Sequence, residues 1–537
     1  MRALSREMER NDPAGSEKAR SGPLPEGWVT VPLGNVLREA LRNGHSAKAS
    51  SDGRGIRTLT LTAVTVGDFS ECNTKVTVAD PAKVRDLWLE SGDLLVERAN
   101  TPELVGTARL YRGPSGYAIF PDLLIRVRLS EGVSPSFVEL ALSTDSARSH
   151  FRRSAQGIAG SMPKIDQQTI EEFPLVLAPE PEQRRIVDEV EKQFTRLDAA
   201  VAGLQRAKAN LKRYRASVLK AACEGRLVPT EAELARREGR SFESGEELLK
   251  RILKERRARW EADQLAKMTA AGRVPSPDGW KAGYREPRKP EIDGVPLPKG
   301  WAYSTVETVG DVLLGRQRAP QYQTGRWTRP YLRVANVKDD RLDFRDVETM
   351  DFDPVHFEKY RLVPGDILVS EGQSPERVGE SAVYRGGIDG LCFQKTLHRF
   401  RPVPGGPSSG FAQIVFRTHV KTGVFMRLAS ITTNIAHLTL EKFEAAPFPL
   451  PPLPEQHRIV AEVERRLSVV DELEATVEKN LARCARLRQS ILKMAFEGRL
   501  VPQDPNEEPA SVLLDRIRER RGPEEPRRRG VRRVPRP

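Results

Sequence analysis

Cysteine is scarce in this chain, with only four among 537 residues. They stand far apart, at Cys72, Cys223, Cys392 and Cys484, and no two form a Cys-x-x-Cys pair. This spacing argues against a disulfide framework and against a zinc site, so we expect free thiols. The seven histidines also lack ligand spacing of the His-Glu-x-x-His kind. We therefore predict no metal site and no cofactor bound by the chain itself.

Long apolar runs are missing as well. No stretch approaches the roughly 18 consecutive apolar residues of a membrane-spanning helix. The beginning of the chain places Arg2, Arg6, Glu7, Glu9 and Arg10 in close order, without the apolar segment of a signal peptide. We expect a disordered leader over residues 1–23, a cytoplasmic location and no membrane partner.

Motifs for catalysis are also absent. The sequence has no Gly-x4-Gly-Lys-Ser/Thr loop for nucleotide phosphates. A methyltransferase acting on a base amino group needs an Asn/Asp-Pro-Pro-aromatic loop, but the one Pro-Pro pair follows Leu450. A metal-dependent nuclease needs spaced acids followed by Glu-x-Lys, and the segments from Asp93 and from Asp366 lack the lysine. Those two segments are better explained as turns that lead into apolar strands. The sequence indicates a binding protein without catalytic residues.

What the chain does have is a long internal repeat. Three motifs occur twice, each pair 273 residues apart: Leu-Pro-Glu/Lys-Gly-Trp at Leu24 and Leu297, Pro-Glu-Gln-Arg/His-Arg-Ile-Val at Pro181 and Pro454, and Glu-Gly-Arg-Leu-Val-Pro at Glu224 and Glu497. A period this long indicates two copies of one domain-plus-helix unit and excludes a solenoid of short repeats. Between the motifs the copies diverge, which predicts one scaffold that presents two different surfaces.

Each copy begins with a globular region that contains short β-type segments between Gly, Pro and Asp, a pattern typical of a mixed α/β or α+β domain. The predicted strand segments are Arg57–Val66, Asp93–Glu97, Leu124–Leu129, Pro330–Val337, Asp366–Ser370 and His398–Phe400. The predicted segments of the whole chain are the leader at 1–23, globular regions at 24–180 and 297–453, long helices at 181–228 and 454–501, a helical connector and linker at 229–296, and a short helix with an Arg/Pro-rich tail at 502–537.

The two long helices carry apolar residues at steps of three and four. The seam positions are Val190, Phe194, Leu197, Val201, Leu204 and Leu211 in the first helix, and Val463, Leu467, Val470, Val477, Leu481 and Ile491 in the second. Such spacing over more than four heptads predicts a coiled coil. Lys208, Arg215, Glu474 and Arg488 interrupt the seams. We expect the helices to pair with each other in an antiparallel arrangement; pairing with partner helices is the alternative. At a rise of about 1.5 Å per residue, 35 helical residues would span roughly 50 Å.

The net charge of +13 is unevenly distributed. From Asp515 to Pro537 there are ten arginines and four acids, so this tail contributes +6 and the remainder of the chain only +7. A basic tail attracts phosphate groups without sequence preference, but a terminus that only keeps the protein soluble would have the same composition. Bulk charge therefore supports nucleic-acid binding only weakly.

The repeated Leu-Pro-x-Gly-Trp, Gly-Asp-x-Leu-Val, Pro-Glu-Gln-x-Arg-Ile-Val and Glu-Gly-Arg-Leu-Val-Pro motifs together resemble those of the specificity subunit of type I restriction-modification enzymes, over Leu24 to Arg521. The resemblance implies an α+β fold with an internal pseudo-two-fold repeat, in which two α/β target-recognition domains are separated by a long antiparallel two-helix coiled coil. It implies double-stranded DNA, methyltransferase (M) subunits and restriction (R) subunits as partners. S-adenosylmethionine, ATP and Mg would then be bound by those partners, which supply adenine methylation and ATP-dependent cleavage.

The candidate DNA-binding residues lie in loops, where a rigid frame usually holds its binding side chains. Over Gly92–Gly113 and Gly365–Gly386 the copies share 11 of 22 positions, mostly turn and core residues, whereas Arg98 faces Glu371 and Asn100 faces Gln373. The candidates from this loop are Arg98, Asn100, Thr101, Gln373, Ser374 and Arg377. The resemblance adds Ser161, Lys164, Thr433, Asn434 and His437 from the loop before the last strand, and Arg333, Asn336 and Lys395 from the second copy alone.

Two other functions remain open at this point. A coiled-coil scaffold that binds only proteins would explain the long seams and the modest charge outside the tail. A nuclease or methyltransferase without recognisable motifs is the other alternative. A neighbouring gene for an adenine methyltransferase would distinguish a DNA-recognition subunit from both.

Overall fold

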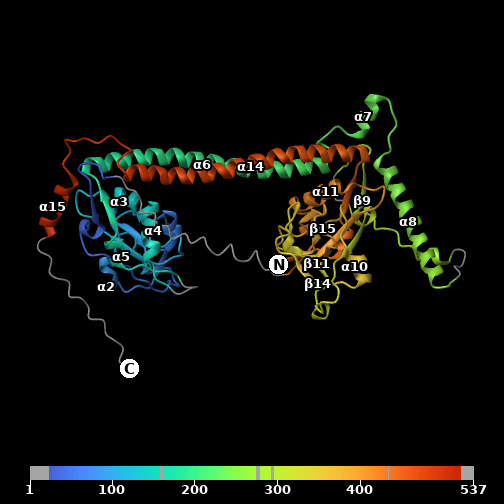
Figure 1. Cartoon of the computed structure of the whole chain (residues 1–537), viewed down its shortest axis with the longest axis horizontal. Coiled ribbons are helices and arrows are strands. Elements are labelled where there is room, and N and C mark those ends of the chain that lie inside the picture. Colours follow the sequence, from blue (N-terminus) through green and yellow to red (C-terminus); the bar gives the residue numbers. More distant parts are fainter. Residues whose placement is uncertain (1–22, 158–161, 274–278, 292–295, 433, 522–537) are drawn as a thin grey trace, which may run out of the picture. The chain divides into compact units, whose positions relative to one another are not determined.

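The structure is a computed structural model that describes residues 23–157, 162–273, 279–291, 296–432 and 434–521. The chain forms two compact units (Figure 1). Unit 1 comprises the described residues up to Leu204 and those from Lys479 onward, and unit 2 runs from Gln205 to Glu478. The long helices α6 (Glu180–Cys223) and α14 (Leu453–Phe496) therefore each contribute to both units. The predicted segment boundaries at Pro181 and Pro454 fall at the starts of these two helices. The two compact units, in contrast, divide in the middle of the helices, so the predicted domain boundaries stay a prediction.

Unit 1 is built around a four-stranded antiparallel sheet in the order β2-β7-β5-β6. The strands of unit 1 are β1 (Val29–Pro32), β2 (Arg42–Asn43), β3 (Ile56–Leu59), β4 (Thr74–Thr77), β5 (Leu94–Glu97), β6 (Ala108–Leu110), β7 (Leu124–Val127) and β8 (Pro174–Leu177). Its α-helices besides α6 and α14 are α1 (Leu61–Val66), α2 (Pro81–Val84), α3 (Pro135–Leu142), α4 (Asp145–Ser154), α5 (Gln167–Glu171) and α15 (Ala510–Arg521). Strands β1 and β8 form a separate antiparallel pair, as do β3 and β4.

Unit 2 repeats this plan with the order β10-β19-β15-β17 in its main sheet. Its strands are β9 (Ala302–Thr305), β10 (Gly310–Leu314), β11 (Thr328–Leu332), β12 (Val337–Lys338), β13 (Arg341–Leu342), β14 (Glu348–Asp351), β15 (Ile367–Ser370), β16 (Gly372–Gln373), β17 (Ser381–Val383), β18 (Cys392–Phe393), β19 (Leu397–Pro402), β20 (Ser430–Thr432), β21 (Ile435–His437) and β22 (Pro447–Leu450). Its α-helices are α7 (Glu231–Glu238), α8 (Gly245–Ala270), α9 (Val306–Val309), α10 (Pro354–Tyr360), α11 (Ser409–Lys421), α12 (Val424–Leu428) and α13 (Leu440–Glu444). The predominance of antiparallel pairing makes both units α+β.

The central strand β5 is buried on both faces, which explains why its first three residues are apolar. Leu94 and Val96 point into one hydrophobic core and Leu95 into another, because successive side chains of a strand alternate between its faces. Strand β15 does the same in unit 2, with Ile367 and Val369 on one side and Leu368 on the other.

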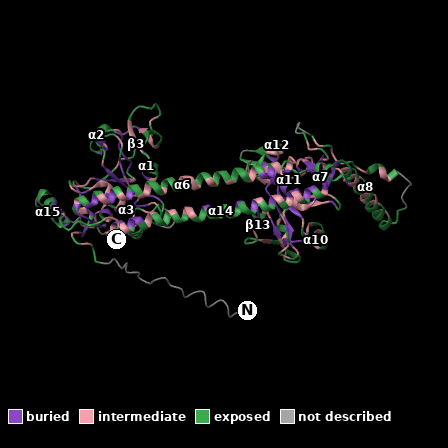
Figure 2. Cartoon of the chain, turned by 90° about the horizontal axis from the view of Figure 1, so that it is seen from above, coloured by how far each residue is buried: buried purple, intermediate pink, exposed green. Residues whose placement is uncertain are grey.

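The long helices lie side by side and antiparallel in each unit (Figures 1 and 2). In unit 1, the Arg488 guanidinium pairs with Asp198 and stacks 4.3 Å from the centre of the Phe194 ring. In unit 2, Arg215 pairs with Asp471. Asp198 and Arg215 each have their repeat mate 273 residues later, in Asp471 and Arg488, so the two ion pairs are copies of one contact.

Other charges in the seam are paired as well. Lys208 pairs with Glu478, and Glu474 accepts a hydrogen bond from Arg215 at 3.0 Å. The charged residues that interrupt the seam therefore contact the opposite helix. Of the predicted seam positions, Val190, Val463, Leu467, Val470, Val477 and Ile491 are buried, and Phe194, Leu197, Val201, Leu204, Leu211 and Leu481 are half-buried. Figure 2 shows that the middle of both helices is largely exposed.

The repeated Pro-Glu-Gln motif anchors each long helix to its globular core. Trp28 donates its indole N–H to Oε2 of Glu182 at 2.8 Å. Gln183 donates to the carbonyl of Ala178 at 2.9 Å and accepts from the amide of Ser134, the N-cap residue of α3, at 2.9 Å. In unit 2 the same bonds join Trp301 to Glu455, and Gln456 to Pro451 and Ser408.

Each unit also contains the Glu-Gly-Arg-Leu-Val-Pro segment of the other copy. In unit 1, Gly498 has a φ of +65° and packs so closely on Pro25 that a Cβ atom would lie 2.2 Å from the proline Cγ. In unit 2, Gly225 meets Pro298 in the same way, at 2.3 Å. Only glycine combines this left-handed conformation with such a close approach. The copies therefore exchange their C-terminal segments.

A helix further along the chain docks at an equivalent place in each unit, α15 in unit 1 and α8 in unit 2. The amide of Ala510, the first residue of α15, donates to the carbonyl of Gly27 at 2.8 Å, and the amide of Gly245, the first residue of α8, donates to Gly300 at 2.7 Å. Leu513, Leu514 and Ile517 of α15 are buried in the larger core of unit 1. Helix α8 runs to Ala270 and lies within the helical connector predicted at 229–296.

Two predicted strand segments were wrong in part. Arg57–Val66 is a strand only as far as Leu59 and then forms helix α1, which ends at Gly67 with a φ of +75°. Pro330–Val337 is strand β11 as far as Leu332 and then a short 3-10 turn. Arg57–Val66 is rich in β-branched residues, and packing against the cores overrides that local preference.

No helix in the described part of the chain has the length and apolar character needed to cross a membrane.

A buried histidine makes unit 2 sensitive to acid. Desolvation lowers the pKa of His419 to about 4, although its Nε2 contacts the carbonyl of Pro447 at 2.7 Å. Desolvation also lowers the pKa of buried His398. Because the unfolded chain binds a proton near pH 6.5 and folded His419 does not, the unfolded state binds more protons between these values, and stability falls as the pH drops.

We expect the free energy of unfolding of unit 2 to decrease by about 2 kcal/mol from His419 alone between about pH 7 and about pH 5. Denaturant titration at both pH values measures it. The Gln side chain of the His419→Gln variant can still donate to the carbonyl of Pro447 but does not titrate. Between the two pH values, the free energy of unfolding of the variant should therefore fall by about 2 kcal/mol less than that of the unchanged protein. Equal pH dependence in both proteins would contradict the prediction.

Candidate functional site

The loop after β5 and its equivalent after β15 have the same backbone. In unit 1, the amide of Gly106 donates to the carbonyl of Glu97 at 2.9 Å, and Val105 donates to Thr101 at 2.9 Å. In unit 2, Gly379 donates to Ser370 at 3.1 Å and Val378 to Ser374 at 3.0 Å. Each loop is therefore closed by the same bonds, while its side chains differ.

Three loops meet in unit 1 to form what we call loop cluster 1, residues 98–106, 121–123, 156–157 and 162–165. The amide of Arg98 donates to Leu123 at 2.8 Å, and the amide of Ile165 donates to the carbonyl of Arg98 at 2.9 Å. Lys164 and Gln156 exchange two backbone hydrogen bonds of 2.9 Å, and Lys164 also forms a bridge with Ala99.

Loop cluster 2 is the equivalent in unit 2, residues 371–379, 394–396, 430–432 and 434–438. The amide of Glu371 donates to Thr396 at 3.0 Å, and Leu438 donates to the carbonyl of Glu371 at 2.7 Å. Strand β21 pairs with both β16 and β20, which joins the hairpin to the loop after β15. The two bonds of Glu371 and the pairing of Gly372 with His437 have their mates in loop cluster 1, so the two clusters share a frame.

The structure brings most of the predicted residues of loop cluster 1 together, at different depths. Thr101 and Lys164 are exposed and Arg98 is half-buried. Asn100 is only 7% exposed, and its amide donates to Oε2 of Glu97 at 2.6 Å. Asn100 therefore supports the loop from inside, and its expected contact with a ligand stays a prediction. Ser161 lies outside the described residues.

Beneath this loop lies an acidic group that the sequence did not indicate. Glu97 is fully buried and also accepts from the Thr65 hydroxyl at 2.5 Å. Desolvation raises the pKa of Glu97, and the hydrogen bonds from Thr65 and Asn100 offset this only in part. Ser370 occupies the equivalent position in unit 2, so the support beneath the loop differs between the copies.

In loop cluster 2, the exposed predicted residues are Arg377, Lys395 and Asn434, and the half-buried ones are Gln373, Ser374 and His437. Arg377 is held by Glu380 through two bonds of 2.9 and 2.8 Å. His437 lies 3.3 Å from Oε1 of Glu371. Thr433 lies outside the described residues.

The Arg333–Asn336 segment adjoins loop cluster 2, because the amide of Val334 donates to the Thr396 hydroxyl at 3.1 Å. Asn336 is 2% exposed; its amide donates to the carbonyls of Asp343 and Asp346, and its oxygen accepts from Arg333. This side chain closes a turn, and its expected contact with a ligand stays a prediction. The Arg333 guanidinium is half-buried and pairs with Asp346 and with Glu348.

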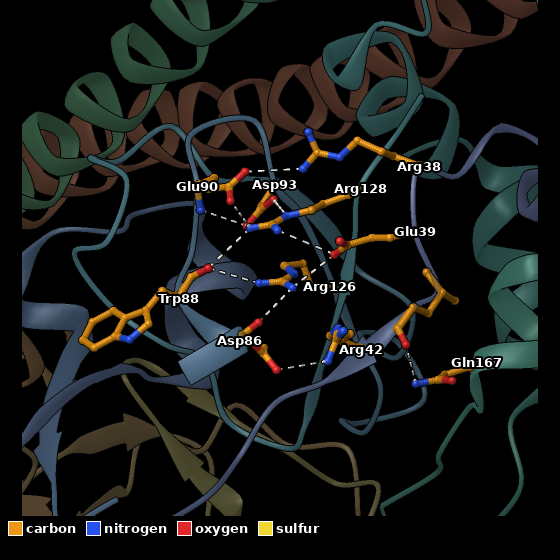
Figure 3. Close-up of polar contacts among 11 residues, drawn as sticks. Arg38, Glu39, Arg42, Asp86, Trp88, Glu90, Asp93, Arg126, Arg128 and Gln167 are labelled. Carbon is orange, nitrogen blue, oxygen red and sulfur yellow. Dashed lines mark hydrogen bonds and ion pairs between the residues drawn. The ribbon is translucent and has the colours of Figure 1, made fainter. Parts of the chain in front are cut away.

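A cluster of charged residues behind β7 looks like a reactive site but is an internal clamp (Figure 3). Arg126 is 3% exposed and donates to the carbonyls of Trp88 and Asp86, each at 3.0 Å. Arg128 forms two bonds with the Asp93 carboxylate, of 2.6 and 3.1 Å. Asp93 is itself buried and holds the half-buried Arg128, so its carboxylate is not free to bind a metal.

The same clamp recurs in unit 2, where Arg401 binds Asp366 through bonds of 2.6 and 2.7 Å. In the described parts of the chain, no three His, Cys, Asp or Glu side chains are placed to hold a metal ion. Each loop cluster by itself offers polar side chains to a ligand, and the side-chain chemistry differs between the two clusters.

Comparison with known proteins gives one family match. Residues 298–483 match the family described as the type I restriction modification DNA specificity domain. The chain is 25% identical over 361 residues to the type I restriction enzyme EcoAI specificity subunit of Escherichia coli, covering 57% of this chain and 55% of that protein. It is 27% identical over 202 residues to the EcoKI specificity subunit of Escherichia coli K12, covering 36% and 43%. The chain thus spans about half the length of these curated relatives.

A solved structure described as showing complex assembly and conformational transition of the type I R-M system has a similar fold. It superposes with a TM-score of 0.60 at 20% identity and covers 89% of this chain and 100% of that chain. At this identity the likeness concerns the fold.

Proposed function

We propose that this chain, which is related to the specificity subunits of type I restriction enzymes, is the subunit that recognises DNA sequence in a type I restriction-modification complex. Each unit reads one half of a bipartite, asymmetric site. The chain itself is not catalytic. Methyltransferase subunits, which bind S-adenosylmethionine, and restriction subunits, which use ATP and Mg, act at the DNA that it selects.

The observation that carries this proposal is the pair of loop clusters with one backbone and different side chains. Sequence is read by polar side chains against base edges, whereas phosphates are held by basic groups and backbone amides. Lys164 and Arg98 in loop cluster 1, and Lys395, Asn434 and Gln373 in loop cluster 2, supply such groups. Unlike side chains on a common frame would read unlike half-sites.

A scaffold that binds proteins alone is not favoured, because the family match is to a DNA specificity domain and includes the globular part of unit 2. The long helices remain the expected docking surface for the methyltransferase subunits.

Exchange of the recognition unit tests the proposal. Residues 24–178 are replaced by the equivalent segment of a related chain, and residues 497–521 are exchanged with them because they pack in the same unit. Adenine methylation across the genome is then sequenced in hosts that carry either protein and in a host without the gene. We expect one half of the methylated sequence to change and the other to stay.

A matched exchange of residues 297–450 in unit 2 should change the opposite half. Change of both halves by one exchange, or of neither, would contradict the assignment of one half-site to each unit. A host whose methylation is the same with and without the gene would contradict the function itself.

A further inference from the structure

One stretch of unit 2 is strongly basic in a way that unit 1 does not match. From Arg316 to Lys338 the chain has no Asp or Glu, and its six cationic residues are Arg316, Arg318, Arg326, Arg329, Arg333 and Lys338. The equivalent residues 43–65 of unit 1 have three cationic residues and one acid. The excess positive charge therefore belongs to one unit, and it is interleaved with Tyr322 and Trp327.

Within this stretch, residues 320–327 form what we call the arginine–tryptophan loop, and Asp351 fixes its shape. Asp351 Oδ2 accepts from the amide and hydroxyl of Thr324, each at 2.6 Å, and from the amide of Gly325 at 3.0 Å. Its Oδ1 accepts from the amide of Trp327 at 3.2 Å and from the hydroxyl of Thr328 at 3.2 Å. These hydrogen bonds, that of the Thr324 hydroxyl first, lower the pKa of Asp351, so the carboxylate is ionised at neutral pH.

The other end of the loop is fixed by a cation–π contact. The guanidinium of Arg316, which is 7% exposed, lies 4.1 Å from the centre of the Tyr322 ring. Asp353 lies 3.7 Å from the same guanidinium. A loop held at both ends presents its remaining side chains with little loss of conformational entropy on binding.

Those remaining side chains include Arg326 and Trp327. The Trp327 side chain is 40% exposed, and the Arg326 guanidinium lies 5.4 Å from the centre of its ring. Arg329 lies 4.5 Å from the Phe357 ring. With the described residues, neither arginine forms an ion pair or a side-chain hydrogen bond. Their N–H groups are therefore available to an anion, and the planar guanidinium group suits two oxygens of one phosphate.

Strand β11 connects this loop to loop cluster 2. Trp327 precedes the strand, Arg333 follows it, and Val334 contacts Thr396 of loop cluster 2. At about 3.3 Å per residue, the six steps from Trp327 to Arg333 span roughly 20 Å. B-form DNA rises about 3.4 Å per base pair, so this distance corresponds to about six base pairs.

We propose that the arginine–tryptophan loop, together with Arg329, is a second DNA contact of unit 2, which binds backbone phosphates beyond the bases that loop cluster 2 reads. This proposal rests on the proposed function. The contact adds affinity without sequence preference, and only the unit 2 side of the site has it. Arg316, Arg318 and Arg333 are paired with Asp353, Glu348 and Asp346, whereas Arg326 and Arg329 form no ion pair with the described residues. Two unpaired guanidinium groups favour a polyanion as the ligand.

The test uses the full chain alone with two DNA duplexes, one carrying the site found by methylation sequencing and one with that site scrambled. Dissociation constants are measured over a series of salt concentrations. Each phosphate contact contributes about 0.9 to the slope of log K against log salt. We expect Arg326→Gln and Arg329→Gln each to lower the slope by about 1, and the double variant by about 2. Both duplexes should be affected equally, and the methylated sequence should stay the same.

The control is Arg465→Gln with Arg466→Gln, which removes the same charge from helix α14 in the same unit. Its slope should equal that of the unchanged protein. An unaltered slope in the Arg326/Arg329 double variant overturns the proposal. Loss of affinity for the target duplex alone also overturns the proposal, because it would assign these arginines to base reading. Unchanged DNA binding with weakened methyltransferase binding overturns it as well. Failure of the unchanged chain to prefer the target duplex would instead overturn the proposed function.

Discussion

Ending the chain at Phe496 is expected to unfold unit 1 and to leave unit 2 folded. The lost segment includes Leu513, Leu514 and Ile517, which are buried in the larger core of unit 1. Burial of three such side chains contributes on the order of 5 to 9 kcal/mol. Whole domains are stable by only about 5 to 15 kcal/mol. The shortened unit 1 would therefore expose its core, and Pro25 would lose its contact with Gly498.

Hydrogen exchange measures this result unit by unit. Amides of β5 in unit 1 should lose their protection, whereas those of the equivalent strand β15 should keep theirs. A chain that ends at Arg521 is the matched control, since it lacks the Arg-rich tail but keeps α15. Protected amides in β5 of the chain that ends at Phe496 would show that unit 1 does not depend on this segment.

Val470→Pro has the second largest expected effect, because Val470 is 1% exposed and lies inside α14. Proline removes the hydrogen bond from the amide of residue 470 to the carbonyl of Arg466 and clashes with that carbonyl, at a cost of about 3 kcal/mol or more. Loss of the buried valine adds about 1 to 3 kcal/mol. The break falls beside Asp471, so the ion pair with Arg215 would be lost as well.

Two alanine variants separate the backbone effect from the side-chain effect. Val470→Ala removes the buried methyl groups alone, and Val469→Ala changes a neighbour that is 48% exposed. In urea unfolding of unit 2, we expect the proline variant to be the least stable, Val470→Ala to be intermediate, and Val469→Ala to match the unchanged protein. A proline variant as stable as Val470→Ala would mean that α14 is not continuous at this point.

The sequence predicts this fold best where local pattern and burial agree. Strand β5 is apolar at each of its first three positions because both of its faces are covered, and its preceding turn is marked by Gly92 with a φ of +98°. The long helices begin beside Pro181 and Pro454 and end just before Gly225 and Gly498, as proline and glycine indicate. These features depend on neighbours in the sequence.

Features that depend on distant neighbours could not be predicted in this way. The 273-residue period does not reveal that Gly498 packs on Pro25 of the other copy. Asn100 and Asn336 have the polar character of base-reading residues, and only the folded loops show that both are buried. The sequence between Arg316 and Lys338 contains no Asp or Glu, which points to the arginine–tryptophan loop. The net charge of the whole chain does not reveal this local excess of positive charge.

The exchange of segments between the copies also sets an order for folding during synthesis. Unit 2 is continuous from Gln205 to Glu478, so all of its residues have been made before α15 is translated. Unit 1 begins earlier in the chain, but it can be completed only later, because Arg521 of α15 donates to the carbonyl of Gly34, 487 residues upstream. Ribosomes add about 5 to 20 residues per second. The N-terminal part of unit 1 therefore leaves the ribosome with an open core, exposed to chaperones and proteases for tens of seconds, until helix α15 closes it.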